Sequence, residues 1–310
     1  MIVSCGEALI DLIAGEDGAG GTVFGPRPGG SPFNVAIGIA RLGVPAGFFG
    51  GLSEDFFGAM LKDALAASGV DRRFVVTSGR PSSLAFAMST DDETEYAFFD
   101  QGSAGRMLTD ADLPAFPRTV TALHFGSLSL TDEPCGSAFE TLMQREQRDC
   151  LISLDPNVRP SQIGNRDGYI ARIDRLAAMS DIVKLSVADL AWLAPDTEFA
   201  AVAERWLGKG AALVVLTKGA AGAEARSRTA TASIAAAPAA VVDTIGAGDA
   251  FTAGLLAHLD TAGRLSKAAV GQLTSGELAA ALGFAARVAA ITVGRAGADP
   301  PWREELASAA

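Results

Sequence analysis

The alternation of short apolar runs with longer amphipathic segments constrains the fold of this chain most strongly. The apolar runs are bounded by Gly, Pro or Asp, as buried parallel strands commonly are. Strand–helix alternation predicts βαβ units, and hence a mostly parallel sheet with helices on both faces. The predicted strands are Ile2–Cys5, Ala46–Phe49, Thr121–Phe125, Leu151–Leu154, Ile182–Leu185 and Leu213–Leu216, and the clearest predicted helices are Pro32–Leu42, Phe56–Ala67 and Ser137–Gln147.

Two regions interrupt this rhythm in the first third of the chain. Leu9–Phe24 is the first, and Leu84–Met88 with Tyr96–Phe99 is the second, built around the polar turn Ser89-Thr90-Asp91-Asp92-Glu93. They predict a small antiparallel excursion that covers a ligand site as a lid. We place the lid segments at about residues 11–27 and 84–103.

A further antiparallel pair is predicted over Ala221–Ala237, with Arg226-Ser227-Arg228 at the tip of the hairpin. The chain has no long linker, fixed-period repeat or block of like charge. We therefore expect residues 1–310 to form one domain, because 310 residues suffice for a single large α/β core.

Charge and cysteine content exclude several classes of protein. A formal net charge of −11 and a pI near 4.7 argue against a nucleic-acid or anionic-membrane surface, which needs concentrated Lys and Arg. Cys5, Cys135 and Cys150 have no C-x-x-C spacing, so they predict reduced, mostly buried thiols. The start of the chain lacks a basic region followed by a long apolar one, and we expect a cytoplasmic protein.

The segment Asp243-Thr244-Ile245-Gly246-Ala247-Gly248-Asp249 carries the clearest chemistry. Gly-Ala-Gly at the start of a helix offers closely spaced backbone N–H groups at the positive end of the helix dipole, where phosphate binds. Asp249 has two interpretations. It could cap the helix, or it could be a general base that takes a proton from an attacking hydroxyl.

A second glycine cluster lies far upstream, at Gly29-Gly30-Ser31-Pro32-Phe33-Asn34-Val35-Ala36. The two glycines allow the backbone to approach a ligand, and Asn34 offers a donor and an acceptor to a polyol. A simple turn with an amide cap is the alternative. The chain has neither G-x-x-x-x-G-K-[ST] nor G-x-G-x-x-G, so a P-loop protein or a dinucleotide-dependent oxidoreductase is disfavoured.

Together, Gly29–Ala36 and Asp243–Phe251 resemble the two signatures of the PfkB (ribokinase-like) carbohydrate kinase family. The resemblance extends over essentially the whole chain. It implies a ribokinase-like fold: a three-layer, doubly wound α/β structure with a mostly parallel sheet and a small β-sheet lid. It also implies that Asp249 is the catalytic base and that Gly246, Ala247 and Gly248 form an anion hole.

The same resemblance implies a sugar site. Asp11 matches the family Asp that binds sugar hydroxyls, although a turn-forming Asp is the alternative, and Gly29, Gly30 and Asn34 line the same site. Asp155-Pro156-Asn157-Val158-Arg159-Pro160 resembles the D-x-N-x-R element of fructokinases and 2-keto-3-deoxygluconate kinases. Asn157 then lies near the phosphates and Arg159 reaches substrate or phosphate. Phe98 covers an apolar sugar face, or packs within the lid.

Nucleotide and metal positions follow from the resemblance too. Thr217-Lys218-Gly219 resembles the nucleotide-binding turn, and Lys184 is either a nucleotide contact or a solvated strand end. Asp189 stands where the family has the Glu of N-x-x-E, which organises Mg²⁺ through water; Ser186 replaces the Asn. A shorter carboxylate can still hold a hydrated Mg²⁺.

The C-terminal region Ala279–Ala298 resembles the helix and turn that flank adenine. In several relatives a monovalent cation lies between this turn and the Asp-Thr segment. A K⁺ site in this chain would be formed by backbone carbonyls, which we assign to Asp243, Ile245, Thr292, Arg295 and Gly297.

The sequence thus predicts an ATP-dependent sugar kinase that uses Mg²⁺ and D-fructose. A 2-keto-3-deoxygluconate kinase is the alternative, and a non-catalytic sugar or nucleotide sensor on the same fold is the alternative of another class. The lid sheet offers an edge for a homodimer. His124 is expected to be a satisfied core group, and neither it nor His258 has a metal-ligand partner at a recognisable spacing.

Overall fold

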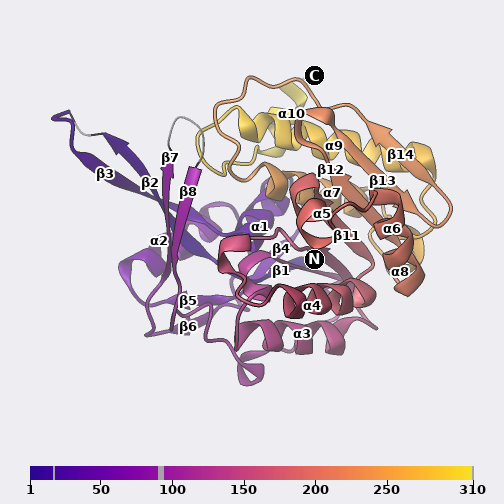
Figure 1. Cartoon of the computed structure of the whole chain (residues 1–310). Helices are drawn as coiled ribbons and strands as arrows, with labels where there is room; N and C mark the ends of the chain where they lie inside the picture. The colour runs from indigo at the N-terminus through magenta and orange to yellow at the C-terminus, as the bar shows by residue number, and fades with distance from the viewer. Residues whose placement is uncertain (17, 90–93, 309–310) are drawn as a thin grey trace.

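An eight-stranded sheet runs through the middle of the protein, with strand order β14-β13-β12-β11-β10-β9-β1-β4 (Figure 1). The structure is a computed structural model that describes residues 1–16, 18–89 and 94–308. The pairings from β4 to β12 are parallel, as predicted. The strands are β1 (Ile2–Cys5), β4 (Ala46–Phe49), β9 (Ala122–Gly126), β10 (Leu151–Asp155), β11 (Ile182–Ser186), β12 (Leu213–Thr217), β13 (Ala223–Ser227) and β14 (Thr231–Ile234).

Helices cover both faces of this sheet, which confirms the three-layer, doubly wound architecture (Figure 1). One face packs against α3 (Cys135–Glu146), α4 (Arg166–Met179), α5 (Val187–Leu193) and α6 (Phe199–Lys209). The other packs against α1 (Ser31–Arg41), α7 (Ala247–Thr261), α8 (Lys267–Val270), α9 (Ser275–Val293) and α10 (Arg303–Ser308). Short 3-10 helices lie at η1 (Asp110–Asp112), η2 (Ser127–Leu130), η3 (Pro160–Gln162) and η4 (Gly219–Ala221).

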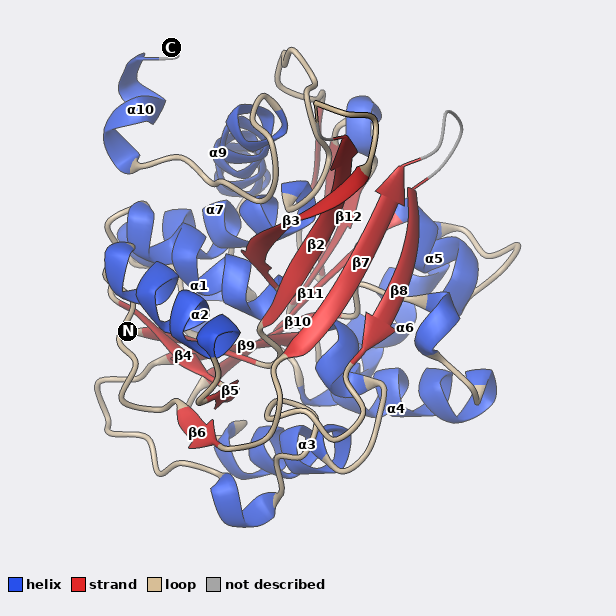
Figure 2. Ribbon diagram, turned by 90° about the vertical axis from the view of Figure 1, so that its left-hand side faces the viewer, coloured by secondary structure: helices blue, strands red, loops and turns tan. Residues whose placement is uncertain are grey.

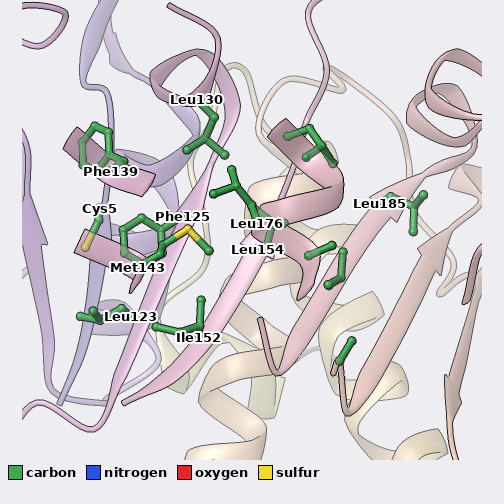
Figure 3. Close-up of a cluster of buried hydrophobic side chains, with 14 of the residues drawn as sticks. Cys5, Leu123, Phe125, Leu130, Phe139, Met143, Ile152, Leu154, Leu176 and Leu185 are labelled. Atoms are coloured by element: carbon green, nitrogen blue, oxygen red, sulfur yellow. The ribbon is translucent and has the colours of Figure 1, made fainter. Parts of the chain in front are cut away.

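The strands read as continuous apolar runs because both of their faces are buried. In β10, Leu151 points into the core beneath α1 and α7, whereas Ile152 and Leu154 point into the core beneath α3 and α4. Figure 3 shows this second core, where Phe125 of the sheet lies near Phe139 of α3, and Leu154 of the sheet belongs to the same cluster. Burying such side chains supplies most of the favourable free energy of folding.

A separate four-stranded sheet forms the lid, in the order β3-β2-β7-β8 (Figure 2). It consists of β2 (Leu9–Glu16), β3 (Thr22–Gly29), β7 (Ser83–Ser89) and β8 (Thr94–Phe99). The expectation of a purely antiparallel lid is wrong at its centre, because β2 and β7 pair in parallel. Both strands leave the main body in the same direction, so only a parallel pairing can join them. Of the predicted polar turn, residues 90–93 lie outside the described part.

The lid is attached to the main body through a third apolar cluster shared with α1 and α2 (Phe56–Ala67). Beside α2, β5 (Gly51–Ser53) and β6 (Val76–Ser78) form a two-stranded sheet. At the far edge, β13 and β14 form the predicted hairpin, but Arg226 still pairs with Thr231 inside the ladder, so the turn begins after Ser227. Among the described helices, α9 alone is long and apolar enough to cross a membrane, and here it packs against α7 and β14.

Candidate active site

A cavity of about 1030 Å³ opens where the parallel strands end, between the main sheet, the lid and the first turn of α7. This is where open α/β sheets bind ligands. Most of the site residues predicted from the sequence line it: Asp11, Gly30, Asn34, Phe98, Asn157, Arg159, Lys184, Asp189, Thr217, Gly219, Ile245, Gly246, Ala247, Gly248 and Asp249. Gly29, Lys218, Asp243, Thr292, Arg295 and Gly297 do not.

The first turn of α7 lines the cavity through Gly246, Ala247 and Gly248. The helix begins at Ala247, and Gly246 precedes it in the left-handed conformation, with φ of 76°. A Cβ at this position would lie 2.5 Å from the Cβ of Ala298, so both the conformation and the space require glycine. The Ala247 amide makes a long hydrogen bond to the Thr244 carbonyl, at 3.3 Å, and the start of the helix dipole favours an anion at this turn.

Asp249 lies in that first helical turn and is buried. Its Oδ1 accepts a hydrogen bond from Ser31 Oγ at 2.6 Å, and its Oδ2 accepts one from Asn34 Nδ2 at 2.8 Å. The capping interpretation of Asp249 is therefore wrong, because Gly246 holds the N-cap position and the carboxylate reaches across to α1. Ser31 was not predicted as a site residue, although it stands within the Gly29–Ala36 cluster.

Asp11 enters the cavity from β2 of the lid sheet, close to Gly29 of β3. A side chain at Gly29 would collide with the Asp11 carboxylate, so Gly29 makes room for Asp11 without lining the cavity itself. Burial and the nearby Asp249 carboxylate raise the pKa of Asp11 to about 7, although the Arg159 guanidinium lowers it. The charges of Asp249 and Arg159 therefore both act on the Asp11 carboxyl group.

The loop after β10 brings Asn157 and Arg159 to the cavity. Asn157 has a positive φ of 40°, and its Oδ1 accepts a hydrogen bond from Arg159 Nη1 at 2.8 Å. Beneath them, Lys184 Nζ of β11 donates to Asp155 Oδ2 at 2.7 Å. Lys184 is buried, so the interpretation as a solvated strand end is wrong. Asp155 was not predicted as a site residue; its place at the end of an apolar strand was the available signal.

Asp189 lines the cavity, but hydrogen bonds within the protein occupy much of its carboxylate. Its Oδ2 accepts from the backbone N and the Oγ of Ser186, closing a capping box at the start of α5. Its Oδ1 accepts from Val158 N at 2.7 Å. One lone pair of Oδ1 remains, which suits contact with a hydrated Mg²⁺ better than direct coordination. Among the described residues, no cluster of three His, Cys, Asp or Glu could hold a metal by itself.

The predicted nucleotide turn follows β12. Thr217 and Gly219 line the cavity, whereas the Lys218 ammonium turns away and donates to Glu224 Oε2 at 2.8 Å. A further group of lining residues is small and uncharged. It consists of Ala236, Ala237, Pro238, Ala239 and Val241 from the loop after β14, and Ala286, Ala289, Ala290 and Val293 from α9. This lining suits a flat apolar group such as a purine base.

Asp243 joins the two turns that were assigned to K⁺. Its Oδ1 accepts from Ile245 N at 2.9 Å and its Oδ2 from Gly297 N at 2.8 Å. The carbonyl of Thr292 accepts a hydrogen bond from the backbone N of Arg295 at 3.0 Å, and the Arg295 side chain pairs with Glu305. The structure thus brings both segments together beside Gly246, through a carboxylate as well as backbone groups.

The histidines and cysteines lie apart from this chemistry. His124 Nδ1 lies 3.0 Å from Ser153 Oγ, but its buried Nε2 has no partner among the described residues, so the expected satisfied core group is only half satisfied. Burial and the nearby Lys184 charge lower the pKa of His124 to about 3. His258 packs against Phe284. All three cysteines are buried free thiols, as predicted.

Comparison with known proteins identifies the family to which this constellation belongs. Residues 1–305 match the pfkB family carbohydrate kinase description. The chain belongs to the pfkB carbohydrate kinase family. It is 45% identical to the fructokinase of Rhizobium leguminosarum bv. trifolii over 273 residues, which is 88% of this chain and 84% of that protein. It is 35% identical to fructokinase-1 of Oryza sativa subsp. japonica, over 99% of this chain and 95% of that protein.

Solved structures agree with this pfkB assignment and confirm the predicted ribokinase-like fold. The crystal structure of fructokinase with bound ATP from Xylella fastidiosa superimposes with a TM-score of 0.91, at 30% identity, over 99% of this chain and 97% of that one. The fructokinase of Vibrio cholerae O395, solved in a form with bound fructose, ADP and calcium ion, gives a TM-score of 0.84 at 26% identity, over 99% and 97% of the two chains.

Proposed function

We propose that this pfkB kinase is an ATP-dependent fructokinase that transfers the γ-phosphoryl group of ATP to a hydroxyl of D-fructose. The observation that carries the proposal is the place of Asp249, in the α7 turn that lines the cavity and within hydrogen-bond distance of Ser31 and Asn34. A carboxylate held beside an anion site is the arrangement that phosphoryl transfer to an alcohol requires. The 45% identity to a bacterial fructokinase supports fructose as the acceptor.

Asp249 acts as the general base in this proposal. It takes the proton of the sugar hydroxyl as that oxygen attacks the γ-phosphorus, and the bond between the γ-phosphorus and the bridging oxygen breaks with its electron pair going to ADP. The amides of Gly246, Ala247 and Gly248 stabilise the charge on the phosphoryl oxygens. Such preorganised donors act strongly because the closed site excludes water.

The sugar is held at the lid side of the cavity. Asp11, Asn34 and Arg159 bind its hydroxyls, Gly30 allows the backbone to approach it, and Phe98 of β8 covers its apolar face. The nucleotide lies on the other side of the anion hole, with Thr217 and Gly219 beside it and the adenine against Ala286 and Ala289 of α9. Asn157 and Lys184 lie nearest the phosphates. Lys218 is left out, because it is paired with Glu224 outside the cavity.

Two cations complete the proposal. Mg²⁺, when bound with ATP, neutralises charge on the β- and γ-phosphate oxygens, and Asp189 is the residue that would hold its water shell. K⁺ would bind to backbone carbonyls beside Asp243, Ile245 and Gly297, where the Asp243 carboxylate already joins both turns. A cytoplasmic location and a homodimer through the lid remain proposals. The exposed Val23 and Phe99 of the lid sheet support the second.

A coupled ADP-release assay tests the function. Fructose, 2-keto-3-deoxygluconate, ribose, tagatose and adenosine are compared as acceptors, with Mg²⁺ and with or without K⁺. We expect fructose to give the highest kcat/KM. If 2-keto-3-deoxygluconate exceeds it, fructose is the wrong sugar and the kinase assignment stands. If no acceptor stimulates ADP release although sugar and ATP both bind, the protein is a sensor on the same fold.

A further inference from the structure

A buried ammonium group lies directly behind the anion hole. Lys184 has 5% of its side chain exposed, yet it lines the cavity beside Gly248. A Cβ added to Gly248 would lie 3.2 Å from Lys184 Nζ. A positive charge so close to Gly248, the last residue of the anion hole, lies within reach of any phosphoryl oxygen that the Gly246–Gly248 amides bind.

The ammonium has donors left for such an oxygen. A lysine ammonium carries three N–H donors. Within the described part of the chain, Asp155 Oδ2 is the one atom that accepts a hydrogen bond from Lys184, at 2.7 Å. Two N–H donors are therefore free to turn toward the cavity. A charge-assisted hydrogen bond from a buried ammonium to phosphate oxygen is stronger than one from a neutral amide.

Asp155 and Thr252 hold this ammonium in place and keep it charged. Asp155 is buried, and Thr252 Oγ1 of α7 lies 3.3 Å from Asp155 Oδ2 and 3.1 Å from the carbonyl of Gly248. Thr252 thus joins the Lys184–Asp155 pair to the first turn of α7. Burial raises the pKa of Asp155 to about 6, and Lys184 opposes that shift. Burial would lower the pKa of Lys184, but the carboxylates of Asp155, Asp189 and Asp249 outweigh it.

We propose that Lys184 is a further catalytic residue, which donates hydrogen bonds to the phosphoryl group during its transfer, and that Asp155 and Thr252 are its positioning residues. The inference rests on the proposed kinase function. In the transfer, the sugar oxygen forms a bond to the γ-phosphorus and loses its proton to Asp249, while the bridging oxygen leaves with ADP. Lys184 neither gains nor loses a proton; it stabilises the negative charge on the non-bridging oxygens.

A purely structural Lys184 is the competing explanation, since it neutralises Asp155. The two explanations differ in one double variant. Lys184→Met alone leaves an uncompensated buried carboxylate, which lowers the melting temperature whatever the role of the lysine. Lys184→Met combined with Asp155→Leu removes both charges and replaces them with apolar side chains. If Lys184 only neutralises Asp155, the double variant regains both stability and activity.

The experiment measures kcat, KM for ATP, KM for fructose and the melting temperature of each variant. We expect Lys184→Met/Asp155→Leu to recover the melting temperature while its kcat stays about 100-fold or more below wild type, the loss typical for removal of one oxyanion donor. Its KM for ATP should change less than its kcat. Lys184→Gln can still donate to Asp155 without a charge, and it should show the same loss if the double variant does not fold.

Lys209→Met is the matched control, because Lys209 is an exposed lysine that pairs with Asp174 and does not line the cavity. The same substitution at that position should leave kcat and both KM values at the wild-type level. A kcat near wild type in the folded double variant or in Lys184→Gln overturns the inference alone. A wild-type protein that forms no ADP with any acceptor of the panel overturns the proposed function first, and this inference with it.

Discussion

Ser31 Oγ donates a hydrogen bond to Asp249 Oδ1 at 2.6 Å, although the two residues are 218 positions apart in the chain. The packing of α1 against α7 makes this contact. At Gly38 the helices approach so closely that a Cβ would lie 2.6 Å from the Cβ of Ala253. The two glycine clusters recognised in the sequence therefore form one site, because each stands at the start of one of these two helices.

Ser31→Ala tests whether this contact orients Asp249. The variant removes one of the two side-chain donors to the carboxylate and leaves Asn34 in place. A hydrogen bond to a charged group contributes about 1.5–3 kcal/mol. We expect kcat to fall by roughly ten- to 100-fold, with a smaller change in KM for ATP. Ser266→Ala, which removes the N-cap of the distant helix α8, is the control and should leave kcat unchanged.

Gly246→Ala tests the geometry of the anion hole. Alanine at a left-handed φ of 76° costs about 1–2 kcal/mol, and its Cβ would also meet Ala298. Both the melting temperature and kcat should fall, as thermal unfolding and steady-state kinetics would record. Gly283→Ala in the middle of α9 is the matched control. Its Cβ meets nothing within 4 Å, so it should stabilise the protein by up to about 1 kcal/mol and keep full activity.

Asp11 should make sugar binding depend on pH. Its ionised carboxylate accepts hydrogen bonds from two hydroxyls, and its pKa is raised to about 7 by burial and by Asp249. Fructose affinity, measured by calorimetry without nucleotide, should therefore increase as the pH rises from 6 to 8. In Asp11→Asn the affinity should be lower and nearly independent of pH. If the fructose affinity of Asp11→Asn depends on pH as steeply as that of wild type, a group other than Asp11 causes the pH dependence.

The raised pKa of Asp11 also affects the stability of the folded protein, which should decrease with rising pH whereas fructose affinity increases. The folded protein holds the proton of Asp11 up to about pH 7, whereas the unfolded chain releases it near the ordinary value of 3.8. The stabilising contribution is therefore complete below pH 3.8 and is lost as the pH rises toward 7. Without sugar, Asp11→Asn should lose less stability than wild type between these pH values in denaturant titrations.

The sequence predicts the main sheet well, because its strands are defined by local composition. Ile2–Cys5 and Ala46–Phe49 have the predicted bounds, and the predicted strands on β9 to β12 each end one residue early. Those missing residues include Asp155 and Ser186, polar groups that an apolar pattern excludes. The parallel pairing of β2 with β7 depends instead on the path of the chain between them, which no local pattern records.

The site residues that the sequence missed are those whose importance depends on burial. The local sequence alone does not reveal the roles of Asp155 and Ser31, because their importance comes from contacts with Lys184 and Asp249 that only the fold creates. Conversely, Lys218 stands in a predicted nucleotide turn, but Glu224 on the neighbouring strand binds its ammonium. Side-chain direction at the end of a strand depends on such partners, so a motif predicts the turn better than it predicts each contact.

The role of Asp249 is tested most directly by fructose-dependent ADP formation in the Asp249→Asn variant, with fructose and ATP binding measured on the same protein. Asparagine keeps the size of the side chain but cannot take the proton. We predict that kcat falls by about 10²–10⁴-fold, the usual contribution of a general base, while both ligands still bind. A kcat within a few-fold of wild type would contradict the assignment of Asp249 as the base.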